Sequence, residues 1–165
     1  MNRIIMNPNV RLSPMTDDDF KTYLEHDIVR YAQENVKAGY WSEAEALDRS
    51  RQAHQRLLPE GQATKNHYFF CIEDIETKDK IGALWLSVDH TSARAVGFIY
   101  DLFVDEPFRR KGYAHQAMLA LEDTAKELGL ETLALHVFAH NRAARALYEQ
   151  LGYELKSLNM TKELR

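Results

Sequence analysis

The alternation of apolar and polar positions is most regular between residues 96 and 128. Residues 96–104 are apolar on both alternating faces except at Asp101, which is typical of a central strand covered on both sides. Pro107 cannot extend a strand, so a turn is expected there. The next segment predicts a helix that ends near Gly129. Its apolar residues recur with the i, i+3, i+4, i+7 spacing of one buried face, at Ala114, Ala117, Met118, Leu121, Ala125 and Leu128.

The part of the chain before residue 96 predicts a strand, two helices and a pair of antiparallel strands. Thr16-x-x-Asp19 and Ser42-x-x-Glu45 are capping boxes, so a helix is expected to follow each of them. The second helix has a thin apolar face and is expected to lie on the surface. The expected elements are a strand at 10–12, helices that reach about Lys37 and about Leu58, and strands at 67–75 and 81–88 joined by a turn at 76–80.

The last part of the chain predicts a strand, a helix and a final strand. The two strands are expected at 132–138 and 153–160. Asn141 can cap the helix between them. The apolar stripe of this helix consists of Ala144, Leu147, Tyr148 and Leu151. The strand–helix–strand unit at 96–138 is expected to be a right-handed parallel crossover. The order of elements therefore predicts an α/β fold of the α+β type, with a mostly antiparallel mixed sheet that contains one parallel strand pair.

Composition and charge narrow the class of protein. A chain of 165 residues suits one domain spanning 1–165, and its 45% hydrophobic and 28% charged residues are typical of a soluble globular protein. A net charge of −4 argues against non-specific nucleic-acid binding. Cys71 is the one cysteine, so no internal disulfide can form, and its apolar neighbours predict burial. No long apolar run indicates a signal peptide or membrane span, so a cytoplasmic protein is expected.

The junction between the central strand and the following helix is the first candidate binding site. A helix that begins at Gly112 offers unpaired backbone N–H groups and the positive end of its dipole, and a residue without Cβ lets an anion approach. Arg109, Arg110 and Lys111 precede it. The pattern predicts a phosphate cradle, although neither the GxxxxGK[ST] nor the GxGxxG motif is present. The alternative interpretation is a solvated basic turn before an ordinary helix.

Two motifs resemble those of the GCN5-related N-acetyltransferase (GNAT) superfamily. Arg109-x-x-Gly112-x-Ala114 is similar to the signature Q/R-x-x-G-x-G/A, with alanine where many members have a second glycine. Residues 141–153 are similar to the block N-x-x-A-x-x-L-Y-x-x-L-G-F/Y. The resemblance is close over 96–164 and loose before that, and the whole sequence most resembles small stand-alone bacterial members. It implies the GNAT acyl-CoA N-acyltransferase fold.

The resemblance also implies acetyl-CoA as the cosubstrate, without a metal cofactor. In the family, the signature loop that here includes Arg109 grips the pyrophosphate of the cosubstrate. Asn141 is expected to hydrogen-bond the cofactor arm. The residues expected by position to wrap the pyrophosphate are Arg110, Lys111, Gly112, Tyr113, Ala114 and His115. The central strand is expected to bulge and to splay from residues 132–138, and the backbone groups expected to pair with the pantetheine arm belong to Leu102, Phe103 and Val104.

The resemblance assigns the role of general acid to Tyr148, which lies on the apolar stripe of the last helix. The alternative is a core tyrosine whose hydroxyl is satisfied. Two residues are candidate bases because each interrupts an apolar strand, Asp101 and His136. A structural half-buried histidine and a water-relayed base remain alternatives. His136 and His140 are four residues apart, about 13 Å along a strand, which is too far for one zinc ion.

The function expected from these residues is transfer of acetyl from acetyl-CoA to a primary amine by direct attack while both substrates are bound. Asp101, with Asp89 and Glu73 as candidate neighbours, favours a cationic acceptor, either a small polyamine-like or amino-sugar amine or a peptide or protein amino group. The alternative function is a CoA-binding sensor without turnover, against which Tyr148 argues. No nucleic-acid or membrane partner is expected. The sequence leaves open the acceptor, the physiological role and the oligomeric state, a homodimer included.

Overall fold

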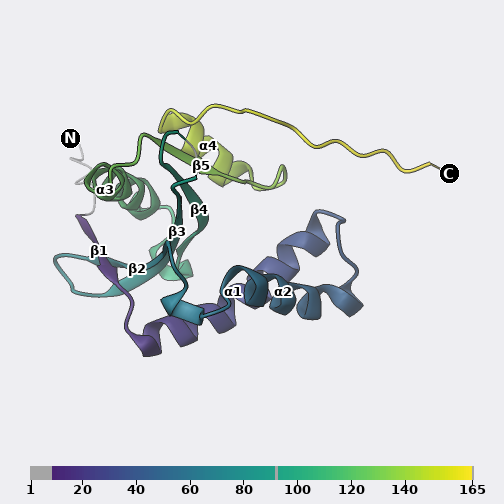
Figure 1. The fold of residues 1–165 in the computed structure, drawn as a ribbon, viewed down its shortest axis with the longest axis horizontal. Coiled ribbons are helices and arrows are strands. Elements are labelled where there is room, and N and C mark those ends of the chain that lie inside the picture. The colour runs from purple at the N-terminus through teal and green to yellow at the C-terminus, as the bar shows by residue number, and fades with distance from the viewer. Residues whose placement is uncertain (1–8, 92, 165) are drawn as a thin grey trace, which may run out of the picture.

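The computed structural model describes residues 9–91 and 93–164, and this part of the chain forms five strands and four α-helices (Figure 1). Short 3₁₀ turns occupy Gly61–Ala63 and Glu106–Phe108. The strands and helices, in chain order, are β1 (Val10–Pro14), α1 (Asp17–Lys37), α2 (Glu43–Leu57), β2 (His67–Asp74), β3 (Lys80–Asp89), β4 (Val96–Val104), α3 (Tyr113–Glu127), β5 (Thr132–Leu135) and α4 (Arg142–Gln150).

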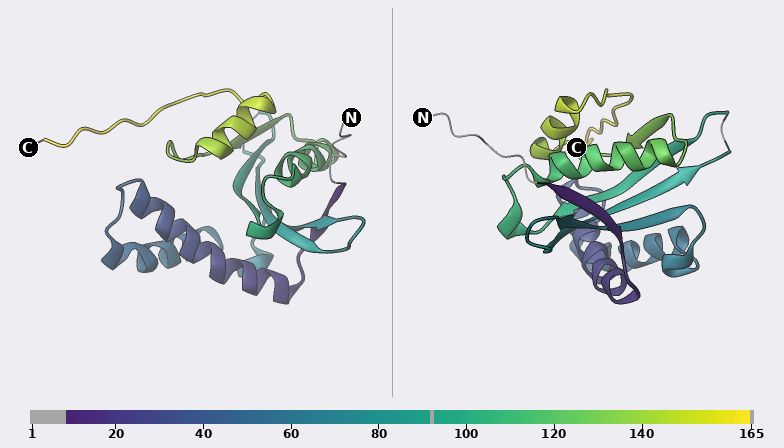
Figure 2. Two further views of the ribbon diagram at one scale, coloured as in Figure 1. Left: turned by 180° about the vertical axis from the view of Figure 1, so that it is seen from behind. Right: turned by 90° about the vertical axis from the view of Figure 1, so that its left-hand side faces the viewer.

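The strands form one sheet in the order β1-β2-β3-β4-β5. β1 to β4 are antiparallel neighbours, whereas β4 and β5 run parallel and are connected through α3. The helices α3 and α4 lie on one side of the sheet, and α1 and α2 lie on the other (Figure 1, Figure 2). The predicted mixed sheet with one parallel strand pair is therefore confirmed.

The residues of β2 divide the core between the two faces of the sheet, because successive side chains of a strand point in opposite directions. Phe70 belongs to the cluster that includes Leu121 of α3. Its neighbour Phe69 packs on the other face, where its ring centre lies 4.7 Å from that of Phe20 in α1. Cys71 is buried on the same side as Phe69, as predicted, and burial raises the pKa of its thiol to about 11.

Both predicted capping boxes are present and fix where α1 and α2 begin. At the start of α1, the Asp19 N–H donates to Thr16 Oγ1 (3.2 Å) and the Thr16 N–H donates to Asp19 Oδ2 (3.0 Å). Ser42 and Glu45 form the second box. These local bonds satisfy amides that a helix start leaves without partners. Within the described residues, no helix combines the length and the apolar character needed to cross a membrane.

The expectation that α2 is a surface helix is only partly correct. The helix packs against α1 and buries Ser50 and His54. The Ser50 hydroxyl donates to the carbonyl oxygen of Ile28 in α1, at 2.6 Å. The contact face looks thin in the sequence because small and polar side chains form it, each satisfied by a hydrogen bond.

The strand predicted at 132–138 is shorter than expected, since β5 ends at Leu135. β5 pairs with β4 only from Val96–Thr132 to Ile99–Leu135. Tyr100 forms a β-bulge in β4. Leu86 of β3 pairs with Ile99 and its neighbour Trp85 pairs with Asp101, so Tyr100 is an extra residue without a partner in β3. Such a bulge bends and twists its strand. The two parallel strands separate after this point, as the expected splay requires, although the bulge precedes Leu102–Val104 rather than falling on it.

The final strand predicted at 153–160 is wrong for the described chain. Residues 153–164 adopt no regular secondary structure. Tyr153 still packs against the core, and the chain beyond it runs away from the body of the protein (Figure 1). The exposed fractions of Leu155, Leu158, Met160 and Leu164 are 66%, 70%, 88% and 89%. A strand requires a neighbouring strand to satisfy its backbone groups, and residues 154–164 find none among the described residues.

Candidate functional site

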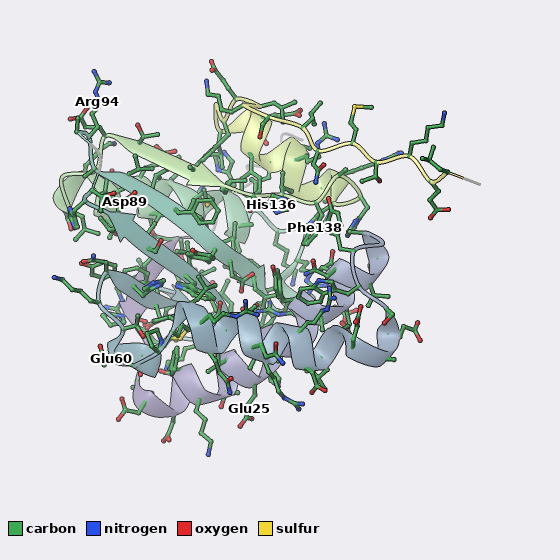
Figure 3. The ribbon with its side chains drawn as sticks, turned by 45° about the vertical axis from the view of Figure 1, so that its right-hand side comes forward. Glu25, Glu60, Asp89, Arg94, His136 and Phe138 are labelled. Atoms are coloured by element: carbon green, nitrogen blue, oxygen red, sulfur yellow. The ribbon has the colours of Figure 1, made fainter. Side chains whose placement is uncertain are left out.

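A cavity of about 980 Å³ opens where β4 and β5 diverge. Its walls come from α1 and α2 on one side, from β3, β4 and β5, and from α4 and the start of α3 on the other. Figure 3 labels His136 and Phe138 in the segment between β5 and α4, which forms one edge of the opening. The cavity therefore combines the predicted cradle with both strands of the splayed pair.

The start of α3 forms a cluster of free backbone amides at this cavity. Gly112 is the N-cap, with φ of +88°, and Arg110 also has a positive φ of +62°. Gln116 makes the first backbone hydrogen bond of the helix, to the Gly112 carbonyl oxygen at 3.1 Å. Within the described chain, the N–H groups of residues 111–115 have neither backbone nor capping side-chain partners. These donors and the helix dipole suit an anion such as a phosphate.

Most residues expected to wrap the pyrophosphate line the cavity, namely Arg110, Gly112, Tyr113, Ala114 and His115. Lys111 is exposed and lies outside the lining. The Tyr113 hydroxyl donates to Asp74 Oδ2 at 2.5 Å, and this bond raises the pKa of the phenol to about 12. The Tyr113 side chain is therefore anchored to the end of β2, and its backbone N–H is the group available to a ligand.

Arg109 occupies a different position from the other residues of the signature loop. Its Nε donates to the carbonyl oxygen of Val104 at 2.7 Å, and its guanidinium carbon lies 5.1 Å from the Phe103 ring centre. The side chain thus folds back onto the end of β4 while still lining the cavity. This bond and contact tie the signature loop to the strand, whatever further contact Arg109 makes to a ligand.

Two further sets of predicted residues reach the same cavity. Leu102, Phe103 and Val104 line it, and beyond Ile99 the edge of β4 that faces β5 has no ladder partner in the described sheet. Asn141 also lines the cavity, and its Oδ1 accepts from the Ala144 N–H at 3.1 Å as the cap of α4. Its side-chain NH₂ can still donate to a ligand.

Asp101 lies in a charged cluster at the inner wall. Its Oδ2 accepts from the Tyr23 hydroxyl at 3.1 Å and from Arg30 Nη2 at 2.9 Å. Burial first, and then the negative charge of Asp27, raise the pKa of Asp101 to about 7, against the opposing effect of Arg30. A carboxyl with this pKa can both accept and release a proton near neutral pH.

Tyr148 lies on α4 and lines the cavity together with Asp101 of β4. Burial, followed by the charge of Asp101, raises the pKa of the Tyr148 phenol to about 12. The phenol therefore stays protonated at neutral pH and remains a hydrogen-bond donor. The structure thus brings together two candidate catalytic groups that are 47 positions apart in the sequence.

The other candidate base and the two expected acidic neighbours lie differently. His136 is exposed just beyond the end of β5, where it lines the cavity next to Phe138 (Figure 3). Glu73 pairs with Arg11 at 2.6 Å, and Asp89 accepts from Thr91. Neither of these acids lines the cavity, so their expected place beside Asp101 is wrong. Asp27, one turn before Arg30, provides the neighbouring charge instead.

The first two helices also contribute to the site, which the sequence-based predictions did not include. Arg30 bonds Asp27 at 3.0 Å as well as Asp101, and its guanidinium carbon lies 3.7 Å from the Phe103 ring centre. His54 Nε2 lies 2.9 Å from Asp27 Oδ2. Burial opposes protonation of His54, but the hydrogen bonds with Asp27 and the Ser50 carbonyl and the charges of Asp27 and Asp101 together outweigh it and raise the pKa of the imidazole. The sequence contains one signal of this contribution. Asp27 and Arg30 have the i, i+3 spacing of an ion pair on a helix, and they lie along the apolar stripe of α1.

An aromatic wall was also missed. The rings of Trp85 and Tyr100 stack with centres 4.6 Å apart, and the Trp85 indole N–H donates to His67 Nδ1 at 2.9 Å. The ring of His54 lies 5.9 Å from that of Trp85. Trp85, Tyr100 and His54 all line the cavity. The part of the cavity beside Asp101 is thus bounded by aromatic faces, which attract a cation.

The comparisons with known proteins agree with this geometry. The chain is 41% identical over 155 residues to the uncharacterized N-acetyltransferase YycN of Bacillus subtilis (strain 168), a match that covers 94% of this chain and 99% of YycN. It is 39% identical over 153 residues to the uncharacterized N-acetyltransferase YdgE of the same organism, covering 93% and 97% of the two chains.

A structural relative and a family model complete the comparison. The crystal structure of the putative acetyltransferase YycN from Bacillus subtilis has a TM-score of 0.92 to this chain at 40% identity, covering 95% of this chain and 99% of that one. The model of the acetyltransferase (GNAT) family matches residues 28–153. On these matches and on its mixed sheet with a splayed parallel pair, the chain belongs to the GNAT family of acetyltransferases.

Proposed function

We propose that this protein transfers acetyl from acetyl-CoA to a primary amine by direct attack in a ternary complex. One observation carries the proposal: the free amides of residues 112–115, Asp101 and Tyr148 all line a single cavity at the point where β4 and β5 separate. The amides suit a diphosphate, and the two side chains suit the two proton transfers of acyl transfer. The proposal thus accounts for both the binding and the chemical parts of the site.

The cosubstrate would lie along β4. Its pyrophosphate would accept hydrogen bonds from the N–H groups of residues 111–115, with Arg110 supplying positive charge at the cavity wall. Its pantetheine amides would pair with the free backbone edge of Leu102–Val104, in the position that a longer β5 would occupy. This placement directs the thioester toward the bulge at Tyr100 and toward Asp101.

The reaction would need two protons removed from the nitrogen and one supplied to the sulfur. The acceptor arrives as an ammonium of pKa about 10.4, and the Asp101 carboxylate would take the first proton from it and pass it to solvent. The amine then attacks the thioester carbonyl carbon, the C–S bond breaks, and the thiolate takes a proton from the Tyr148 hydroxyl. The second nitrogen proton would then leave for the Tyr148 phenolate through solvent, which restores the phenol and gives the neutral amide. His136, exposed at the cavity edge, is the second candidate for the base.

The acceptor would be a cationic primary amine. The aromatic faces of Trp85 and Tyr100 and the carboxylates of Asp101 and Glu34 line the part of the cavity next to α1. Aromatic faces and carboxylates both attract an ammonium group. The same wall suits a small amine, such as a polyamine or amino sugar, or the amino group of a peptide. No observation favours a CoA sensor without turnover.

A panel of amines tests the proposed activity. Mixed with acetyl-CoA and polyamines, amino sugars or lysine and α-amino peptides, the protein should release free CoA thiol in proportion to at least one acceptor. The thiol is measured with a chromogenic disulfide, and acetylation of the acceptor by mass spectrometry. Tight CoA binding without thiol release from any amine would contradict the proposal and favour the sensor.

The Tyr148→Phe substitution tests the general acid. The variant should lower kcat by about 10²-fold or more, because the leaving thiolate loses its proton donor, while the CoA affinity stays unchanged. The matched control is Tyr153→Phe, since Tyr153 lies five positions along the chain and outside the cavity lining. Its kcat should match that of the parent protein. Parent-like turnover in Tyr148→Phe would remove this phenol from the mechanism.

The pH dependence of kcat/KM tests the base. Asp101 must be ionised to accept a proton, and its pKa is raised to about 7, so kcat/KM should rise between about pH 6 and about pH 8. Asp101→Asn should lower the rate by about 10²-fold and abolish this step. The comparison variant is His136→Gln, which should keep the step. Loss of the step in His136→Gln and its retention in Asp101→Asn would transfer the role to His136.

The Gly112→Val substitution tests the cradle. A side chain at φ of +88° is strained and obstructs the approach of the pyrophosphate, so calorimetry should show at least about tenfold weaker CoA binding. Gly129→Val is the matched control at the other end of α3, because Gly129 has φ of +74° and open space around it. It should suffer similar strain and bind CoA normally. Equal affinities of the two variants would contradict the assignment.

A further inference from the structure

The segment 154–164 is the part of the described chain that packs on nothing. Every residue in it is exposed, and it extends away from the sheet in Figure 1 and in the left-hand view of Figure 2. It nevertheless carries four large apolar side chains, Leu155, Leu158, Met160 and Leu164, whose exposed fractions lie between 66% and 89%. Burying such a side chain is worth about 1.5–3 kcal/mol, so a segment of this composition gains from a partner.

The sequence of this segment is that of a strand. Leu158, Met160 and Leu164 occupy positions of the same parity, so in an extended chain they share one face. Residues 153–164 contain neither glycine nor proline, the two residues that most strongly interrupt an extended chain. The segment therefore places three large apolar side chains on one face, with Lys162 between Met160 and Leu164, and has a free backbone. It continues outward instead of returning toward its own β5 (Figure 1).

The edge of β5 is the complementary surface. β5 is the last strand of the sheet and pairs on one side only, with β4. The core next to it is incompletely covered, since Leu133, Leu135, Leu151 and Tyr153 are only partly buried. The Tyr153 hydroxyl is enclosed and has no hydrogen-bond partner among the described residues. An open strand edge beside a half-covered apolar cluster is a template for another strand.

We propose that residues 154–164 of one copy pair with the β5 edge of a second copy, which returns its own segment in the same way. The chain carries both the donor strand and the acceptor edge, so a two-fold dimer satisfies both at once. The apolar face of the donated segment would cover the cluster around Leu133 and Leu151, and its backbone would extend the sheet. This inference is independent of the proposed reaction.

The test measures the mass of the full-length protein by size-exclusion chromatography with light scattering. The parent protein should have about twice the chain mass of 19.1 kDa. The double variant Leu158→Asp/Met160→Asp should have the mass of one chain, because it places two charges on the face to be buried. Both side chains are exposed in the single copy, so its circular dichroism should equal that of the parent.

A matched variant and hydrogen exchange distinguish strand pairing from other contacts. Asn159→Asp/Thr161→Asp adds the same charge to the opposite face and should remain dimeric. The amides of residues 132–135 should exchange slowly in the parent and at least about tenfold faster in Leu158→Asp/Met160→Asp.

Three results would overturn the inference. One is a monomeric parent protein, including a monomer with protected β5 amides, which would place the segment on its own sheet. The second is a dimer that survives Leu158→Asp/Met160→Asp. The third is a parent dimer in which the amides of residues 132–135 exchange as fast as in that variant.

Discussion

The rest of the structure depends on where the hydrogen-bonded ladder between β4 and β5 ends, at Ile99 and Leu135. A parallel pair normally continues until one strand ends in a loop, but here the bulge at Tyr100 turns β4 away first. The edge of Leu102–Val104 lies beside a cavity instead of a neighbouring strand, and of its backbone groups the Val104 carbonyl oxygen accepts from Arg109 Nε. Unpaired backbone groups in a folded core are unfavourable unless a ligand or water satisfies them. We therefore propose that the interruption of the sheet is what makes the cavity a binding site.

The same separation brings together groups of opposite electrostatic character. At one end of the cavity, the start of α3 presents free amides and the positive end of a helix dipole. At the inner wall, Asp27 and Asp101 share Arg30 as their counter-ion. Because two acids share one guanidinium in a buried place, Asp101 holds its proton more tightly than an exposed carboxyl. An anionic ligand group and a cationic one are thus attracted to different ends of one cavity.

Local signals in the sequence predicted the elements well. The capping residues Thr16 and Ser42, the turn at Gly112 and the apolar run of 96–104 each act within a few positions, and each was placed correctly. Tyr148 and Asn141, which the family motif contains, and Asp101, which interrupts the apolar strand, all line the cavity. The contribution of α1 could not be predicted in this way. Arg30 and Asp101 are 71 positions apart, and only the folded sheet brings them within 2.9 Å.

Two errors share a physical cause. The strand predicted at 132–138 ends early, and that predicted at 153–160 does not form in the single copy. In both cases the alternation of residues indicates an extended chain but contains no information about the strand beside it. A β-ladder needs two strands, and a bulge or an open edge elsewhere in the sheet decides whether the second strand is present. Strand patterns therefore predicted conformation more reliably than pairing.

The most direct test of this account is a crystal structure of the protein with coenzyme A. The account predicts that the diphosphate accepts hydrogen bonds from the amides of residues 111–115 and that the pantetheine arm follows the free edge of Leu102–Val104. The sulfur should then lie between Asp101 and Tyr148. Coenzyme A bound elsewhere, or with its diphosphate away from the start of α3, would contradict the central claim that the interrupted sheet forms the binding site.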